Sequence, residues 1–344
     1  MNRRADRKSF FRELLRESAN AVRGAQSTLQ SRLSETEAGD SPPQWTGWSQ
    51  SPPRASAPTV RTASGGELLS LCSTMALETH SEDIVRLLRP SVRATPSSVA
   101  AVGPHSRSRL GGSPDVPADF EWPAHDGRAF AFVGQFDLAD LSRRFEALEL
   151  PARGLLSFFV ETARAVPIDD VPCRVLHFDE PEGNLSLMRP ESQPTLPDYP
   201  VELSLELTLP RSRSLAVEDL GLSQDEADAW DELRAQLASL QGVELEELSP
   251  DWLNLHRLLG YPEALGGEME PDLELTSPVS IEVDDESLTL VPTDNAKRWR
   301  LLLQVSDDVE LRISAGGGFG RLYFWIEEPD FQASSFDGAR ALFR

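Results

Sequence analysis

The feature that most restricts the fold is a pattern of two strands that occurs twice in the chain. In the first copy, residues 132–136 (Phe-Val-Gly-Gln-Phe) precede residues 154–160 (Gly-Leu-Leu-Ser-Phe-Phe-Val). In the second copy, residues 301–305 (Leu-Leu-Leu-Gln-Val) precede residues 320–326 (Gly-Arg-Leu-Tyr-Phe-Trp-Ile). This repetition predicts two β units built on one plan. The alternative is a chance likeness between two hairpins, because buried strands often share apolar patterns.

The two units predict an α+β fold, with mostly antiparallel or mixed β-sheets from two pseudo-repeats and helices inserted between them. Residues 201–209 (VELSLELTL) alternate apolar and polar side chains. Strict alternation is typical of an antiparallel strand with one face on the core and the other in water. Other strands are expected at residues 129–136, 154–160, 174–178, 279–283, 299–305 and 321–326.

Two helices are expected among these strands. The first begins at Ser223, because Ser-Gln-Asp-Glu forms a capping box in which Glu226 reaches back to the cap. The second is a short helix at residues 252–259, which Gly260 ends.

The first hundred residues differ from the rest and predict a helical N-terminal extension. We divide the chain into an amphipathic helix at residues 1–34, a Pro/Ser-rich linker at 35–66, a helical segment at 67–108 and an α+β domain at 109–344. The first helix has the basic, amphipathic character of helices that dock on a partner or a membrane surface, and equally that of a solvated helix on its own domain. Trp45 and Trp48 in the linker are either a docking motif or a local anchor.

Charge is divided unevenly along the chain and restricts the class of partner. Residues 1–110 hold 15 Lys and Arg against 10 Asp and Glu, whereas the remaining residues hold 18 against 46. Nucleic-acid affinity depends largely on cations that replace counterions, so the acidic part is not expected to bind nucleic acid. Its carboxylates either keep the protein soluble or attract a basic partner protein.

Cysteine content and hydropathy predict a protein of the reducing cytoplasm with no membrane span. Cys72 and Cys173 are far apart and form no disulfide framework. The longest apolar runs have strand length, well below the roughly 20 residues that cross a bilayer.

The residues suited to chemistry are few and scattered, and they predict no cofactor and no metal. The histidines lack metal-ligand spacing, and no Walker loop, dinucleotide fingerprint or Gly-x-Ser-x-Gly elbow occurs. Arg109, His256 and Tyr261 have the side chains best suited to bind an anion or move a proton, although a core histidine hydrogen-bonded to the backbone is the simpler interpretation of His256. Gln135 and Gln304 hold matching places in the two copies, where each either makes a structural hydrogen bond or lines a cleft between the units.

Several motifs resemble, in order, those of the YwqG-like bacterial proteins. They are Leu110-Gly111-Gly112-Ser113-Pro114 with Trp122-Pro123, the Gln-Phe-Asp-Leu run that ends residues 132–138, residues 154–159, His256-Arg257-Leu258-Leu259-Gly260-Tyr261-Pro262, residues 299–304 and residues 320–326. The resemblance covers roughly the last 235 residues. It implies an α+β fold and a family of undetermined biochemical function, some of whose members look like accessories of toxin and immunity gene neighbourhoods. The family usually has a Trp-Gly-Asp-x-Gly segment before the last strand, whereas residues 314–320 here lack the aspartate.

Two functions remain open at this point. The leading hypothesis is a non-enzymatic protein-binding module whose acidic domain engages a basic partner such as a toxin, with the N-terminal helix and linker as an adaptor. The alternative is a small-molecule-binding or hydrolytic protein that uses a cleft between the two β units, with Arg109, Gln135, His256, Tyr261 and Gln304 as binding residues.

Overall fold

The computed structural model describes residues 65–97, 107–161, 168–180, 182–188, 196–246, 249, 252, 254–264, 269–275, 298–307 and 320–344. The chain divides into two compact units, Met1–Ser56 and Ala57–Arg344, and every described residue belongs to the second. The predicted helix at 1–34, the linker up to residue 64, the strand at 279–283 and the altered segment up to residue 319 therefore lie outside the described residues.

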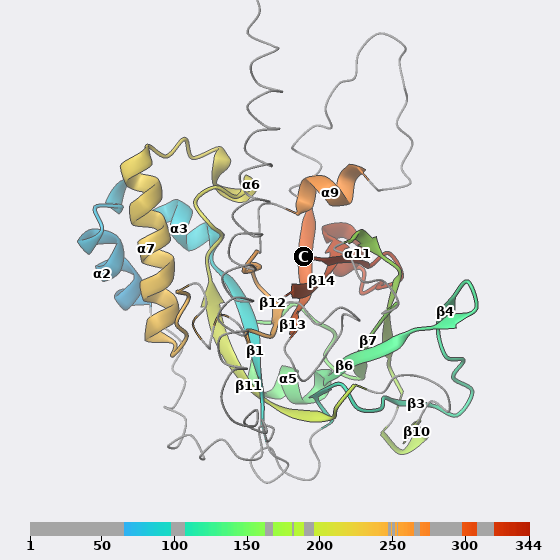
Figure 1. Ribbon diagram of the computed structural model, residues 1–344. Helices are drawn as coiled ribbons and strands as arrows, with labels where there is room; N and C mark the ends of the chain where they lie inside the picture. Colours follow the sequence, from blue (N-terminus) through green and yellow to red (C-terminus); the bar gives the residue numbers. More distant parts are fainter. Residues whose placement is uncertain are drawn as a thin grey trace, which may run out of the picture. The chain divides into compact units, whose positions relative to one another are not determined.

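An eleven-stranded sheet dominates the described part of the chain, and all its pairings are antiparallel (Figure 1). Its order is β8 (Ile168–Val171), β15 (Arg340–Phe343), β14 (Gly320–Glu327), β13 (Trp299–Asp307), β12 (Arg257–Leu259), β1 (Arg89–Pro96), β11 (Tyr199–Thr208), β2 (Arg109–Leu110), β6 (Ala131–Asp137), β7 (Leu155–Val160) and β9 (Cys173–Phe178). Only Pro172 separates β8 from β9, although these strands pair at opposite ends of the order. The sheet therefore curls round and nearly closes. Two small ladders join β3 (Asp115–Pro117) to β10 (Leu185–Leu187) and β4 (Ala124–His125) to β5 (Arg128–Ala129).

The segment predicted as helical at residues 67–108 is helical only in its first part. It contains α2 (Gly65–Thr74), a 3₁₀ turn η2 (Glu78–His80) and α3 (Ser81–Leu87), and then β1 follows. Pro90 cannot continue the helix, and β1 lies between β12 and β11 in the middle of the sheet. Strand pairing on both sides, which no local sequence pattern reports, decides the structure of this segment.

The alternation predicted for residues 201–209 holds in only half of β11. Val201 and Leu203 are buried and Glu202 is exposed, as expected, but Glu206 is 2% exposed. Both faces of the strand are covered at that level, and Arg257 compensates the buried carboxylate at 2.6 Å. The prediction of one wet face is therefore wrong for the C-terminal half of the strand.

The predicted helix at residues 252–259 is wrong for its C-terminal part, because residues 257–259 form β12. Leu258 and Leu259 are both fully buried between β1 and β13. A strand covered on both faces shows a continuous apolar run, which periodicity cannot distinguish from a helix.

The capping box predicted at Ser223 is confirmed and begins α7 (Gln224–Leu240). The buried face of this helix packs with α2 and α3 in a separate apolar cluster that includes Trp230, Leu68 and Ile84. Figure 1 shows these three helices together on one side of β1 and β11. The remaining described helices are α5 (Leu138–Arg144), α6 (Leu215–Glu218), α9 (Glu270–Leu275), α11 (Glu328–Gln332) and the 3₁₀ turn η3 (Glu182–Asn184).

The two strand pairs singled out from the sequence form with matching registers. Gln135 in β6 pairs with Ser157 in β7, and Gln304 in β13 pairs with Tyr323 in β14. In both pairs the register shifts two positions before the glutamine, between Phe132 and Gly134 in one and between Leu301 and Leu303 in the other.

Candidate functional site

Gln135 lies at the centre of a group of polar contacts that we call the first cluster, formed by Arg107, Ser108, Arg109, Asp115 and Gln135. The Gln135 Oε1 accepts the Asp115 N–H at 2.9 Å, and its Nε2 donates to the Arg107 carbonyl at 2.8 Å. Arg109 pairs with Gln135 across β2 and β6, and its guanidinium reaches the Asp115 carboxylate at 3.5 Å.

Gln304 has the same kind of surroundings in the second cluster, formed by Leu255, His256, Arg257, Glu263 and Gln304. The Gln304 Oε1 accepts the Glu263 N–H at 2.8 Å, and its Nε2 donates to the Leu255 carbonyl at 3.0 Å. Arg257 pairs with Gln304 across β12 and β13, and its guanidinium lies 3.6 Å from the Glu263 carboxylate. Both glutamines are fully buried and bonded to backbone, so both brace a turn beside the sheet.

Histidine and serine take the same place in the two clusters. The Ser108 Oγ accepts the Asp137 N–H at 3.0 Å, and the His256 Nδ1 accepts the Ser306 N–H at 3.3 Å. Complete burial, together with the nearby charge of Arg321, lowers the pKa of His256 to about 3. His256 is therefore neutral at pH 7, and acceptance at Nδ1 places its proton on Nε2, a buried atom without a hydrogen-bond partner among the described residues.

The second cluster continues into a buried network of ion pairs. Glu263 receives Arg234 at 2.6 Å and Arg211 at 3.6 Å, in addition to Arg257. Burial raises the pKa of Glu263, but these arginines lower it more, to about 2. Burial likewise lowers the pKa of Arg257, and the Glu206 and Glu263 carboxylates outweigh that effect and raise it. Glu263 and Arg257 thus both stay charged. Their network is buried, and it stabilises the turn after β12.

Tyr261 follows this turn and is 8% exposed. Its N–H donates to the Thr208 Oγ1 at 3.1 Å, and the Arg89 guanidinium lies 4.6 Å above its ring. Burial raises the pKa of the Tyr261 phenol. Tyr261 also lines a small cavity of about 30 Å³ together with Arg211 and Ser214.

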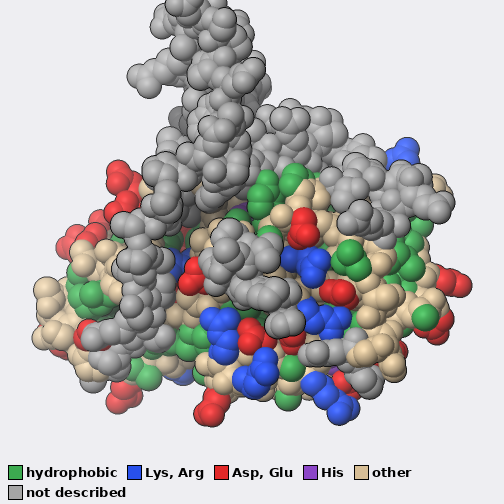
Figure 2. Space-filling view, turned by 90° about the horizontal axis from the view of Figure 1, so that it is seen from below, with side chains coloured by type: hydrophobic (Ala, Val, Ile, Leu, Met, Phe, Trp, Pro, Cys, Tyr) green, Lys and Arg blue, Asp and Glu red, His purple; other side chains and the backbone are tan. Residues whose placement is uncertain are grey.

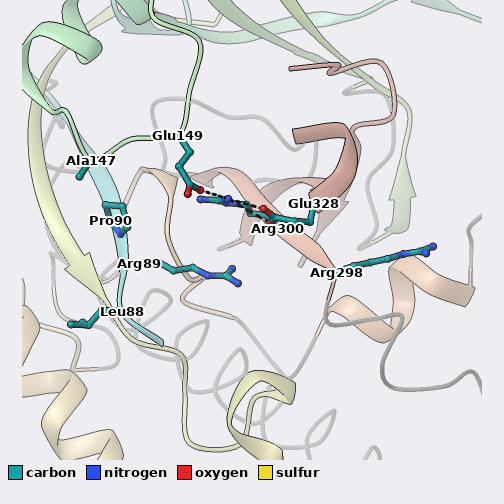
Figure 3. A pocket seen from close by; sticks show the side chains of 8 residues that line it. All are labelled: Leu88, Arg89, Pro90, Ala147, Glu149, Arg298, Arg300 and Glu328. Atoms are coloured by element: carbon teal, nitrogen blue, oxygen red, sulfur yellow. Dashed lines mark hydrogen bonds and ion pairs between the residues drawn. The ribbon is translucent and has the colours of Figure 1, made fainter. Parts of the chain in front are cut away.

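A larger depression lies elsewhere on the described part of the chain, and we call it the arginine hollow (Figure 3). It has a volume of about 610 Å³, within the range of small-molecule sites. Its lining combines the start of β1, the connection after α5, the start of β13 and the start of α11. The lining residues are Leu88, Arg89, Pro90, Ala147, Glu149, Arg298, Arg300 and Glu328.

Arg300 is the best-fixed side chain of the arginine hollow. Its side chain is 7% exposed, and its guanidinium stacks 4.1 Å from the Phe331 ring. The Arg300 Nη1 contacts Glu149 at 2.7 Å and Glu328 at 3.2 Å, while its buried Nε has no hydrogen-bond partner in the part of the chain that the structure describes. Arg298 pairs with Glu327 at 3.3 Å.

Arg89 completes the set of cations and is only partly buried. Its guanidinium stacks on the Tyr261 ring, and no carboxylate among the described residues pairs with it. The hollow thus gathers three arginines, two of which come from the acidic residues 111–344. Figure 2 shows a face on which basic side chains lie interspersed with acidic ones, so the acid excess does not cover the surface uniformly.

Comparison with known families gives one match. The family described as a domain of unknown function (DUF1963) matches residues 108–343. The chain belongs to this family. No curated protein matches the chain.

In the DUF1963 domain, the five predicted binding residues lie in or next to the first and second clusters, and outside the arginine hollow. Arg109 and Gln135 lie in the first cluster, and His256 and Gln304 in the second, with Tyr261 just after it. None of the five lines the arginine hollow. Whether they bind a ligand stays a prediction, which their burial and their backbone hydrogen bonds do not favour.

Sequence reasoning missed the residues of the hollow. One signal was present, because Arg298 and Arg300 stand two residues apart next to the apolar run Leu301–Leu303 and thus project to one side of the strand. Nothing local connected them with Arg89 or Glu149, which are distant in sequence.

Among the described residues, no group of three or more His, Cys, Asp or Glu side chains is arranged to hold a metal ion. Nor does any described helix have the length and apolar content to cross a membrane.

Proposed function

We propose that the DUF1963 domain of this chain binds a small anionic molecule in the arginine hollow. The observation that carries the proposal is a depression of about 610 Å³ lined by three arginines, one of which has no carboxylate partner among the described residues. Arginine presents several donors in a fixed plane and binds carboxylates and phosphates in two-pronged fashion. This proposal follows the cleft hypothesis drawn from the sequence, with other residues in the binding role.

Preorganisation of the cations supports this function. Phe331 and Glu328 hold Arg300, and the Tyr261 ring supports Arg89. Side chains already ordered before binding lose less conformational entropy when the ligand arrives. The described lining consists of three arginines, two glutamates and three apolar residues, and we propose binding and assign no reaction.

The test is calorimetric titration of the whole chain with succinate and with inorganic phosphate at low salt. We expect Arg89→Met to weaken anion binding about tenfold or more, because it removes a cation that has no internal carboxylate partner. Arg143→Met is the matched control, since the Arg143 side chain is 75% exposed and lies on α5 outside the hollow. Equal affinities for wild type and Arg89→Met would refute the proposal.

A basic partner protein is the second candidate, favoured by the charge of residues 111–344, which hold 46 carboxylates against 18 Lys and Arg. This retains the leading sequence hypothesis, in which the domain is an accessory that binds a basic protein such as a toxin. Binding of that kind weakens as salt screens the charges. A purified complex that survives rising salt, or one that Arg89→Met disrupts as strongly as it disrupts succinate binding, would count against it.

We also infer that the two clusters are copies of one duplicated unit. The support is the shared order Arg-Leu-x-Gly-x-Pro-acid at residues 109–115 and 257–263, together with the matched hydrogen bonds of Gln135 and Gln304. The YwqG-like relationship, a bacterial origin and a cytoplasmic location belong to the same set of proposals. They rest on the motif order and on the low cysteine content.

A further inference from the structure

We propose that Glu149 is an internal competitor for the ligand, holding the place on Arg300 that a carboxylate of a small-molecule ligand takes when it binds. This inference rests on the proposed function of the arginine hollow. It assigns the ligand a carboxylate and gives Glu149 control of affinity.

The contacts of Arg300 divide into a fixed part and an exchangeable part. Phe331 stacks on its guanidinium at 4.1 Å, and Glu328 reaches it from α11 at 3.2 Å. The third contact, from Glu149 at 2.7 Å, is the shortest of its ion pairs, yet the Glu149 side chain is 59% exposed. A carboxylate so open to water gains little from its pair and exchanges readily with another anion.

The residues next to Glu149 pack against the core, whereas the Glu149 side chain is exposed. Leu148 and Leu150, on either side, are partly buried against the main core. Glu149 alone of the three lines the hollow, and Figure 3 shows its carboxylate directed at Arg300. A rotamer change is therefore enough to release Arg300, and no rearrangement of the fold is required.

The chemistry of the resident group indicates the chemistry of the ligand. Arg300 is 7% exposed, and a guanidinium so withdrawn from water needs an anion beside it. A ligand carboxylate restores the Arg300 contact that Glu149 gives up, and a second anionic group of the ligand pairs with Arg89, which lines the same hollow and for which no described residue supplies a carboxylate. Binding thus replaces one ion pair and adds another.

The experiment is the same titration with succinate applied to Glu149→Gln, which keeps the size of the side chain and removes its charge. We expect the Kd for succinate to fall about threefold to tenfold, because the ligand no longer competes with a carboxylate for Arg300. Glu146→Gln is the matched control, since Glu146 is exposed in the same connection and does not line the hollow. That variant removes the same charge and is expected to change the Kd less than twofold.

A double variant separates competition from a general change in charge. In an Arg300→Met background the gain from Glu149→Gln is expected to vanish, because the two residues act on one contact. An unchanged or higher Kd in Glu149→Gln, or an equal gain in Glu146→Gln, overturns the inference. Tighter binding of inorganic phosphate by Glu149→Gln without binding of succinate overturns the carboxylate assignment.

The two levels of proposal fail in distinguishable ways. If succinate binds wild type and Arg89→Met weakens it, but Glu149→Gln has no effect, only the inference about Glu149 is wrong. If neither anion binds wild type or Glu149→Gln, the proposed function fails and the inference fails with it.

Discussion

The first and second clusters have the same hydrogen-bond plan in different surroundings. In the first, Arg109 and Asp115 keep side-chain exposures of 17% and 16%, whereas in the second Arg257 and Glu263 keep 3% and 5%. Helix α7 supplies Arg234 to the second cluster, and β11 supplies Glu206. The residues of each turn thus determine its hydrogen bonds. The elements packed over the turn determine how deeply its charged side chains are buried, and therefore how much their ion pairs contribute to stability.

This difference predicts where the fold is sensitive. A pair close to solvent stabilises little, but removal of one partner from a buried network leaves a charge without compensation. The following variants test the two clusters against each other.

The largest difference is expected between Arg257→Met and Arg109→Met. Loss of Arg257 removes the ion-pair partner of Glu206 and weakens the charge compensation of Glu263. This should lower the free energy of unfolding by about 3–5 kcal/mol. Loss of Arg109 should cost about 1 kcal/mol, because Asp115 stays partly hydrated. Urea denaturation measures both, and equal costs would break the comparison.

The next difference concerns two glycines with left-handed backbone, Gly260 at φ 77° and Gly112 at φ 71°. Alanine is strained at both, but at Gly260 its methyl would also lie 2.7 Å from buried Ser91 and from Thr208. At Gly112 it meets Asp198, whose side chain is 55% exposed and can move away. We expect Gly260→Ala to cost about 2–4 kcal/mol and Gly112→Ala about 1–2 kcal/mol. Similar midpoints of thermal unfolding would show that packing over the second turn is no tighter.

Substitution of the two glutamines should lower stability by similar amounts, because their hydrogen bonds are the same in both clusters. Gln135→Met and Gln304→Met each leave a backbone N–H and a carbonyl without their partner, at about 1–3 kcal/mol in each case. Both are fully buried, so burial does not separate them. If the costs of the two variants in urea denaturation differ by more than about 1 kcal/mol, the shared hydrogen-bond plan is not what stabilises the turns.

A further difference between the clusters depends on pH, because His256 in the second cluster takes the place of Ser108 in the first. The pKa of His256 is about 3 in the folded protein, below the ordinary value of 6.5. The unfolded chain therefore takes up a proton first, and the stability contributed by neutral His256 is lost as pH falls below about 6.5. Carboxylates such as Glu263, with a folded pKa of about 2, add their own loss only below about 4.5.

His256→Asn should accordingly flatten the dependence of stability on pH between about 6.5 and 4.5, by at most roughly 1.4 kcal/mol per pH unit. Asparagine keeps an acceptor for the Ser306 N–H. Ser108→Asn in the first cluster is the control and should leave the slope unchanged. Unfolding curves at several pH values decide the matter, and a slope identical to wild type would contradict the assignment.

Sequence patterns predicted the elements whose signals are local. The capping box at Ser223 fixed the start of α7, and apolar runs identified β6, β7, β9, β13 and β14. They failed for β1 and β12, since both take their structure from neighbours on either side of the sheet. They also missed Glu206, because its charge is compensated by Arg257, 51 residues further along the chain.

The candidate site was less predictable than the fold for the same reason. Polar residues inside apolar strands, Gln135 and Gln304, stood out in the sequence and proved to support turns. The arginine hollow is assembled by distant segments that the folded sheet brings together. The spacing of these arginines and glutamates along the chain does not predict that they lie together in the fold.

The curled sheet also bears on how the protein avoids association. β8 and β9 are the two outermost strands, and exposed strand edges are templates for pairing with other chains. Because Pro172 alone separates them in the chain, a change of backbone direction at this residue shifts both edge strands at once. A substitution at Pro172 is therefore expected to affect association between chains through two strand edges and not through one.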